Sequence, residues 1–268
     1  MIKIDKLIDL RYLSWSKTRQ SSGTAGSYLK SYSYDNGKKV YYKLSYFDDV
    51  DNKFGYEAFN EIIAGKLLTL LGYKHLEYNL LFAKILIKDK EYDTYLNSSY
   101  DYKLINETKM SFENFYELYK NDNEDIITFC ERYNFIDEIY QMIIIDYLIV
   151  NRDRHGANIE VLYDSKTKKY RLAPLFDHGL SLLSPAYKDD EIKKYNIKEN
   201  KKVNSFIGTS SLEENIKIVP KNTFKDIKIN FDDLFNDITT NDNNFYMQKA
   251  KELLIRRWNE LEDIFNKK

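Results

Sequence analysis

The sequence predicts an α+β fold of two lobes, with a β-rich N-terminal half and a helical C-terminal half. The first hundred residues alternate strand-like segments around a single amphipathic helix, whereas helical periodicity dominates the remainder. The chain has 268 residues, of which 43% are apolar and 31% charged, a balance typical of a folded protein. We therefore expect an N-lobe over residues 1–100, a C-lobe over residues 101–268, and a cleft between them.

Turns and alternation mark the strands of the N-terminal half. Asp35-Asn36-Gly37 predicts a hairpin, because Asn and Gly tolerate positive φ. This hairpin leads into a strand over Lys39–Phe47, with side chains on alternate faces. Two further strands are expected over Asn79–Lys88 and Thr94–Lys103, joined by a turn at Asp89-Lys90-Glu91.

Helices account for most of the remaining elements. One is predicted over Glu57–Leu71, where apolar residues recur at helical spacing and Gly72 is a natural stop. In the C-terminal half, Ser111 is placed to cap the first helix. The elements expected there are helices over Phe112–Tyr119, Glu124–Tyr133, Asp137–Val150 and Asn244–Phe265, and strands over Ile159–Tyr163 and Tyr170–Leu175.

Charge and composition exclude several classes of protein. The net charge of −1 gives no bulk attraction for nucleic acid, so no direct nucleic-acid partner is expected. Cys130 stands alone and is expected to be a buried apolar residue. The apolar stretch Met142–Val150 is too short to span a bilayer, and residues 1–5 lack the apolar core of a signal peptide. We expect a cytoplasmic protein, or one secreted without a signal peptide.

The residues that indicate chemistry lie at the two ends of the predicted strand pair. Asp153 and Asn158 are five residues apart, the spacing of a kinase catalytic loop, and Asp177 follows the second strand. Mg²⁺ prefers oxygen ligands, which Asn158 and Asp177 can supply. Asp153 is placed to orient an attacking hydroxyl and take its proton. Together they predict transfer of the γ-phosphoryl group of ATP.

Two upstream features extend this set. The small residues of Ser21–Ser27 allow backbone N–H groups to approach phosphates closely, although a plain flexible loop has the same composition. Lys43 is placed to reach the α- and β-phosphates, or else is a solvated strand lysine. Glu61, or alternatively Glu57 one turn earlier, is expected to pair with Lys43. The loop residues expected to bind nucleotide are Gly23, Thr24, Ala25, Gly26 and Ser27.

Four stretches of the chain form a recognisable series: Tyr42-Lys43-Leu44, Tyr56–Glu61, Asn151–Asn158 and Leu172–Asp177. They resemble the HipA-like serine/threonine kinases, in the same order over about residues 19–220. The loop Ser21–Ser27 is similar to that of the short CtkA-type members. The Asp-Arg-His-x-x-Asn core is shared with phosphoinositide kinases, so it marks the superfamily.

The resemblance implies a two-lobed protein-kinase-like fold and a role for each matching residue. Asp153 is the implied catalytic base, Asn158 and Asp177 are the implied Mg²⁺ ligands, and Lys43 is the implied ATP lysine. His155, beside the base, is expected to be structural or to contact phosphate. The implied adenine-binding hinge lies near Ser99–Lys103 and includes Tyr100 and Tyr102.

The implied activity is phosphorylation of Ser or Thr on a protein substrate. Self-phosphorylation is expected within the small-residue loop, and an antitoxin-like protein is a further expected partner. Two alternatives stay open: a lipid kinase of the phosphoinositide type, and a pseudokinase or regulatory partner. The expected self-phosphorylation sites are Ser21, Ser22, Thr24 and Ser27.

Two further charged residues belong to the helix and loop around Asp153. Arg154 is expected either to pair with a carboxylate or to approach phosphate. Asp146 interrupts an apolar run, and a buried carboxylate must be hydrogen-bonded or paired. We expect Asp146 to brace the catalytic loop without taking part in the chemistry.

Overall fold

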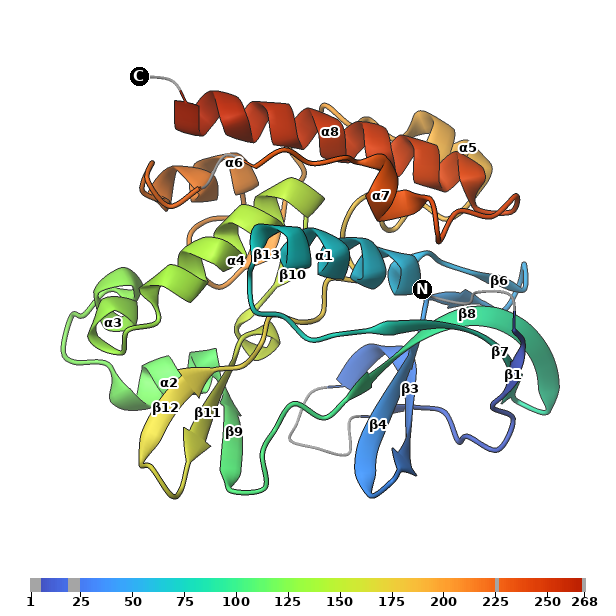
Figure 1. Cartoon of the computed structure of the whole chain (residues 1–268), viewed down its shortest axis with the longest axis horizontal. Helices are drawn as coiled ribbons and strands as arrows, with labels where there is room; N and C mark the ends of the chain where they lie inside the picture. The colour runs from blue at the N-terminus through green and yellow to red at the C-terminus, as the bar shows by residue number, and fades with distance from the viewer. Residues whose placement is uncertain (1–5, 19–24, 225–226, 267–268) are drawn as a thin grey trace.

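The computed structural model describes residues 6–18, 25–224 and 227–266. In Figure 1 a six-stranded sheet and a smaller three-stranded sheet lie side by side, and helices cover them on one side. The six strands run in the order β1-β7-β8-β4-β3-β2, and β1 and β7 are parallel. They are β1 (Ile8–Asp9), β2 (Ser16–Thr18), β3 (Ala25–Asp35), β4 (Lys38–Leu44), β7 (Asn79–Ile87) and β8 (Lys90–Tyr100).

The predicted hairpins form, but several strand boundaries were wrong. The strand predicted over Thr94–Lys103 ends at Tyr100, and the strand predicted over Tyr170–Leu175 ends at Leu172. Strand β8 begins at Lys90 rather than Thr94, because Lys88 and Asp89 adopt positive φ and make a two-residue turn that pairs Ile87 with Lys90. Strand β4 ends at Leu44, and the chain then forms a separate hairpin. That hairpin consists of β5 (Phe47–Asp48) and β6 (Lys53–Phe54).

Helix α1 (Glu57–Leu71) has the bounds that the sequence predicted. Gly72 ends it in the left-handed conformation, with φ of 71°. Its buried residues include the polar Glu57, Asn60 and Glu61 as well as the apolar stripe. A helix that buries carboxylates and an amide must offer them partners, and these partners lie in the candidate site.

The C-terminal half is largely helical, as expected, with three described strands that were not predicted: β9 (Glu107–Ser111), β10 (Asp153–Arg154) and β13 (Asn204–Ser205). Strand β9 is the edge of a sheet of order β12-β11-β9. Ser111 ends β9 and also caps α2, its side chain accepting a 3.2 Å hydrogen bond from the Asn114 N–H. The strands are β9 (Glu107–Ser111), β10 (Asp153–Arg154), β11 (Glu160–Asp164), β12 (Lys169–Leu172) and β13 (Asn204–Ser205).

The helices of this half match the predicted segments within about two residues, and several short helices follow the catalytic segment. Helix α8 packs against α4 and lies at the edge of the molecule in Figure 1. The α-helices are α2 (Phe112–Tyr119), α3 (Ile126–Arg132), α4 (Ile136–Ile149), α5 (Asp189–Lys194), α6 (Leu212–Asn215), α7 (Asp232–Phe235) and α8 (Asn244–Asn266), with 3₁₀ turns η1 (Gly156–Asn158) and η2 (Ile216–Ile218).

Two hydrophobic clusters make up the core. A small one packs against the six-stranded sheet and includes Leu44, Ile85 and Leu96. The large one joins α1, α2, α4 and α8. Helix α1 thus lies between the two halves, because it packs against strands β7 and β8 of the six-stranded sheet and also against α4 and α7. The division into lobes at residue 100 stays a prediction.

Cys130 is buried, as expected of an apolar residue. Across the described ranges, no helix is both long enough and apolar enough to cross a membrane.

Candidate active site

The segment Asn151–Asn158 begins where α4 ends. Val150 adopts a left-handed conformation with φ of 53°, and the Asn151 N–H donates back to the Asp146 carbonyl at 2.9 Å. This sharp reversal takes the chain from the buried helix into β10 and then the 3₁₀ turn η1. The short elements place Asp153 and Asn158 on a compact loop that leads directly into β11.

A buried ion pair fixes this loop. The Arg154 guanidinium donates to both oxygens of the Asp146 carboxylate, each at 2.9 Å, and the Arg154 side chain is only 2% exposed. Its remaining nitrogen donates to the carbonyls of Asn158 at 3.1 Å and Phe176 at 2.9 Å. The Asn151 amide also donates to Asp146, at 2.8 Å. Arg154 therefore pairs with a carboxylate, and Asp146 braces the loop as predicted.

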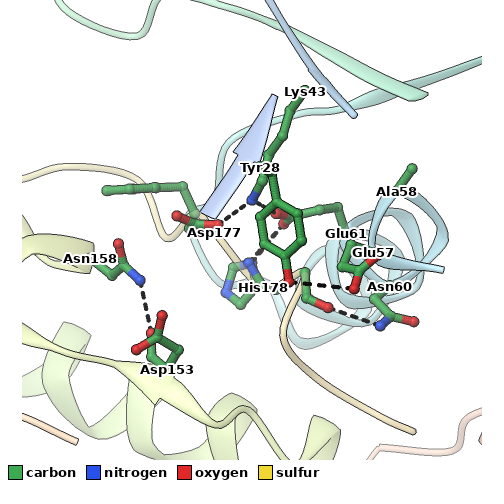
Figure 2. Close-up of polar contacts among 12 residues, drawn as sticks. Tyr28, Lys43, Glu57, Ala58, Asn60, Glu61, Asp153, Asn158, Asp177 and His178 are labelled. Atoms are coloured by element: carbon green, nitrogen blue, oxygen red, sulfur yellow. Dashed lines mark hydrogen bonds and ion pairs between the residues drawn. The ribbon is translucent and has the colours of Figure 1, made fainter. Parts of the chain in front are cut away.

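Asn158 lies directly behind Asp153. Its amide nitrogen donates to the Asp153 carbonyl at 2.8 Å, and Figure 2 shows its amide oxygen directed away from Asp153. The Asp153 carboxylate is about one-third exposed, and its Oδ2 lies 3.8 Å from Nε2 of His155. The loop thus presents a partly exposed carboxylate beside an amide oxygen. His155 is directed at Asp153, and its Nδ1 accepts from the Ala157 N–H at 3.1 Å.

Lys43 lies between two carboxylates. Its ammonium group is 3.2 Å from Glu61 Oε1 and donates a second, short hydrogen bond to Asp177 Oδ1 (Figure 2). Burial would lower the pKa of Lys43, but the charges of Asp177 and Glu61 raise it above its ordinary value. Burial likewise raises the pKa of Glu61, but the Lys43 charge and the bond from His178 bring it below its ordinary value. The ammonium and the Glu61 carboxylate are therefore both charged at neutral pH.

Glu57, the alternative partner of Lys43, has other contacts. Its Oε2 accepts from the Tyr46 N–H at 3.0 Å, and its Oε1 accepts from the Tyr28 hydroxyl at 3.4 Å. Burial raises the pKa of Glu57. Glu61 rather than Glu57 contacts Lys43, because α1 turns Glu61 toward strand β4 and Asp177.

Helix α1 also positions the residues that follow β12. Asp177 has a positive φ of 60°, a conformation uncommon for a residue other than glycine. The next N–H, of His178, donates to Glu61 Oε2 at 2.8 Å. The Asn60 amide donates to the carbonyls of Gly179 and Ser181 at 2.9 and 3.0 Å. Three bonds from one helix thus hold the strained turn that carries Asp177.

Asn158 and Asp177 fit a divalent cation by their chemistry. An amide oxygen and a carboxylate are hard oxygen ligands of the kind Mg²⁺ takes, with nucleotide phosphates and water completing its coordination. The amide nitrogen of Asn158 donates to the Asp153 carbonyl, which leaves the amide oxygen of Asn158 available to a metal. Among the described residues, no group of three or more His, Cys, Asp or Glu side chains forms a metal cluster of its own. The donor set suits a metal shared with a phosphate ligand.

A cavity leads from Lys43 and Asp177 along the inner face of the six-stranded sheet to the connection between the two halves. Its walls combine aromatic, polar and basic side chains, as in a site for a nucleoside. Tyr102 and Phe176 are among the aromatic residues that line it, with ring centroids 5.9 Å apart and an interplanar angle of 26°. The residues that define it include Lys43, Leu76, Tyr78, Asn97, Ser99, Tyr102, Glu160, Phe176 and Asp177.

The two tyrosines of the predicted hinge differ in position. Tyr102 lines the cavity and donates to Glu160. The Tyr100 side chain is exposed and donates to Asp35 at 2.6 Å, at the tip of the β3–β4 hairpin. The structure therefore does not bring the Tyr100 side chain to the cavity, because β8 alternates its faces and Tyr100 falls on the outer one.

The small-residue loop lies only partly within the described residues. Gly23 and Thr24, and the predicted self-phosphorylation sites Ser21 and Ser22, are outside them. Ala25, Gly26 and Ser27 are the first residues of β3, where Ala25 pairs with Thr18. The predicted loop was therefore too long at its C-terminal end, because strand pairing begins at Ala25.

Sequence reasoning missed several residues of the site. The Tyr28 ring lies 5.5 Å from the Lys43 ammonium, and the Tyr28 hydroxyl contacts Glu57. His178 is buried against Glu61, with 3.6 Å between Nδ1 and Oε2. Asn204 contacts Asp153 from 51 residues further along the chain. His178 follows Asp177 directly in the sequence and could have been found from that motif. Tyr28 and Asn204 could not, because their contacts join segments far apart in the chain.

Comparison with known proteins places this site in a kinase context. A family model described as phosphatidylinositol 3- and 4-kinase matches residues 73–243. The serine/threonine-protein kinase CtkA of Helicobacter pylori is 28% identical over 139 residues, which cover 48% of this chain. That alignment spans 42% of the length of CtkA, less than half of the relative.

Two solved structures are similar in fold. The crystal structure of a proinflammatory kinase CtkA from Helicobacter pylori aligns with a TM-score of 0.64 and 19% identity, covering 97% of this chain and 96% of that one. The HipA chain in a Shewanella oneidensis complex of HipA, HipB and operator DNA aligns with a TM-score of 0.48 and 12% identity, covering 92% and 67%. The first of these similarities shows that the kinase-like fold extends over nearly the whole chain.

Proposed function

The chain belongs to the kinase family described as phosphatidylinositol 3- and 4-kinase, with HipA/CtkA-like relatives, and we propose that it is an ATP-dependent serine/threonine protein kinase. One observation carries the proposal: Lys43 is ion-paired to Glu61 and contacts Asp177 in the wall of the cavity. The loop of Asp153 and Asn158 lies beside this group, because Arg154 donates to the carbonyls of both Asn158 and Phe176. A positively charged group, oxygen ligands for a cation and a partly exposed carboxylate are the parts that phosphoryl transfer uses.

The proposed roles follow from the geometry of each group. Lys43, held by Glu61, neutralises charge on the α- and β-phosphates. Asn158 and Asp177 would hold Mg²⁺, which when bound would supply positive charge beside the phosphates. Asp153 orients the acceptor hydroxyl and accepts its proton, for which its exposed carboxylate is accessible. The adenine ring lies in the cavity near Tyr102 and Phe176.

The test measures transfer from labelled ATP to a protein acceptor in the presence of Mg²⁺, followed by identification of the phosphorylated amino acid. We expect phosphoserine or phosphothreonine from wild type, and none from Asp153→Asn, which should still bind nucleotide. Asp177→Asn should weaken Mg-ATP binding as well, because it removes a charged ligand. Mg-ATP should raise the melting temperature of wild type more than ATP with chelator does. A melting temperature unchanged by saturating Mg-ATP would refute the proposal.

A lipid kinase is the second candidate, favoured by the name of the matching family model. The same assay with phosphatidylinositol vesicles as acceptor separates the two candidates. Labelled lipid with unlabelled protein acceptor would replace the protein-kinase proposal and leave the catalytic roles standing.

Self-phosphorylation is part of the protein-kinase proposal. The candidate acceptors Ser21, Ser22, Thr24 and Ser27 precede Tyr28, which contacts Glu57 inside the site. A phosphate on this segment adds about −1.5 to −2 charges and would repel the nucleotide phosphates. Mass spectrometry after incubation with Mg-ATP tests it, with Asp153→Asn as control. Absence of phosphate from residues 21–27 of active wild type would reject this element alone.

A further inference from the structure

A short parallel strand pair places a residue from beyond Asp177 against the catalytic loop. Strand β13 pairs with β10 so that Asn204 lies opposite Asp153. The Asn204 N–H donates to the Arg152 carbonyl at 2.8 Å, and the Phe206 N–H donates to the Arg154 carbonyl at 2.9 Å. The backbone at Asn204 is therefore locked to the loop on both sides of Asp153.

The segment that carries Asn204 is itself anchored. Val203 and Ile207 are buried in the large hydrophobic cluster. The Phe206 ring packs edge-on against Phe112, with centroids 6.0 Å apart. The Val203 N–H also donates to the Ser210 carbonyl at 3.0 Å. Asn204 is an exposed residue on an otherwise fixed strand, so its side chain can be replaced without removing core packing.

The Asn204 side chain is directed at the carboxylate of Asp153. Its amide nitrogen donates to Asp153 Oδ1 at 3.2 Å, while Oδ2 faces His155 at 3.8 Å. Asn158 holds the Asp153 carbonyl from behind. A carboxylate on two rotatable bonds presents a defined oxygen to an acceptor hydroxyl only if something fixes its orientation. A neutral amide donor does this and leaves the negative charge of the base in place.

We propose that Asn204 is a positioning residue for phosphoryl transfer, which orients the Asp153 carboxylate so that Oδ2 is presented to the acceptor hydroxyl. This inference rests on the proposed kinase function. In this proposal, strand β13 connects the segment that follows Asp177 to the carboxylate of Asp153. The role is distinct from nucleotide binding, because Asn204 does not line the cavity and its side chain donates to Asp153.

The test compares Asn204→Ala, Asn204→Asp and the matched control Ser205→Ala in the full chain. Ser205 is on the same strand, but its hydroxyl donates to the Ile207 carbonyl at 2.7 Å and not to Asp153. We expect kcat to fall about 10- to 100-fold in Asn204→Ala, with the KM for ATP and the melting temperature near wild type. Asn204→Asp should be slower still, because it has the same shape but replaces the donor with a like charge. Asn204→Gln should recover part of kcat, and Ser205→Ala should retain it.

A readout that does not need activity keeps this proposal separate from the kinase proposal. The side-chain amide protons of Asn204, followed by NMR, should shift in Asp153→Ala and stay unchanged in His155→Ala. An inactive wild type would refute the kinase proposal, and the NMR result would then decide the contact. Equal kcat in Asn204→Ala and wild type, or amide signals insensitive to Asp153→Ala, would overturn the positioning role.

Discussion

Replacing Arg154 by alanine should destabilise this protein more than the loss of an exposed ion pair would. The variant leaves the buried Asp146 carboxylate without its counter-charge, and removes donors from the carbonyls of Asn158 and Phe176. Breaking a buried pair from one side costs about 3–5 kcal/mol of unfolding free energy. For a protein of this size that lowers the melting temperature by about 10 °C.

The assay is urea unfolding followed by circular dichroism and by tryptophan fluorescence, with coincidence of the two transitions as the check on two-state behaviour. Arg11→Ala is the matched control, because Arg11 also makes a close ion pair, at 2.6 Å to Asp9, but with a side chain 44% exposed. Arg11→Ala should lower the free energy of unfolding far less than Arg154→Ala does. Arg154→Lys should be intermediate, since one ammonium cannot replace the planar fork.

The double variant Arg154→Met with Asp146→Leu removes both members of the buried ion pair. Removing both partners leaves no unpaired charge, so the double variant should lose less than the sum of the two single losses. Stability of Arg154→Ala equal to that of Arg11→Ala would refute the reasoning. Additive losses in the double variant would show that burial of the charge is not the cause.

Two other predictions concern the contacts around α1 and the β5–β6 hairpin. Glu61→Gln should raise the KM for ATP about tenfold, equivalent to about 1.4 kcal/mol, by loosening Lys43, and Glu57→Gln should change it less; equal effects in steady-state kinetics would contradict the assigned pairing. The Tyr187 hydroxyl bond, at 2.6 Å, is the largest cause that lowers the pKa of Asp48 to about 2, so Asp48 stabilises the fold above its ordinary pKa of 3.8 and loses this contribution as the pH falls toward 2. In Tyr187→Phe the pKa of Asp48 should rise toward 3.8, which an NMR titration of the Asp48 carboxyl measures. The stability that Asp48 loses between about pH 4 and pH 2 should then be smaller than in wild type.

Local rules account for what the sequence predicted well. Helices α1 and α2 have the predicted bounds, because Gly72 and Ser111 end and cap them through contacts within a few residues. The hairpin at Asn36-Gly37 follows from the positive φ that these two residues tolerate. Errors arose where pairing over a distance decides an element. Strand β9 forms only because β11 lies beside it, and the start of β8 depends on its register with β7.

The candidate site divides in the same way. The spacing of Asp153, Asn158 and Asp177 is a property of the sequence, and it sufficed to predict a phosphotransfer site. The sequence does not decide whether Glu57 or Glu61 pairs with Lys43, because both lie on the same side of α1. Only the packing of that helix decides which one reaches Lys43.

By itself the sequence determined the two-part α+β organisation and the order of the residues proposed for chemistry, since these depend on local spacing and periodicity. Its resemblance to the HipA-like kinases indicated the family. Only the tertiary structure decided that Arg154 pairs with Asp146, that α1 holds the turn after Asp177, and that Asn204 contacts the carboxylate of Asp153. These contacts join segments far apart in the chain, and their geometry is set by how buried helices and strands pack.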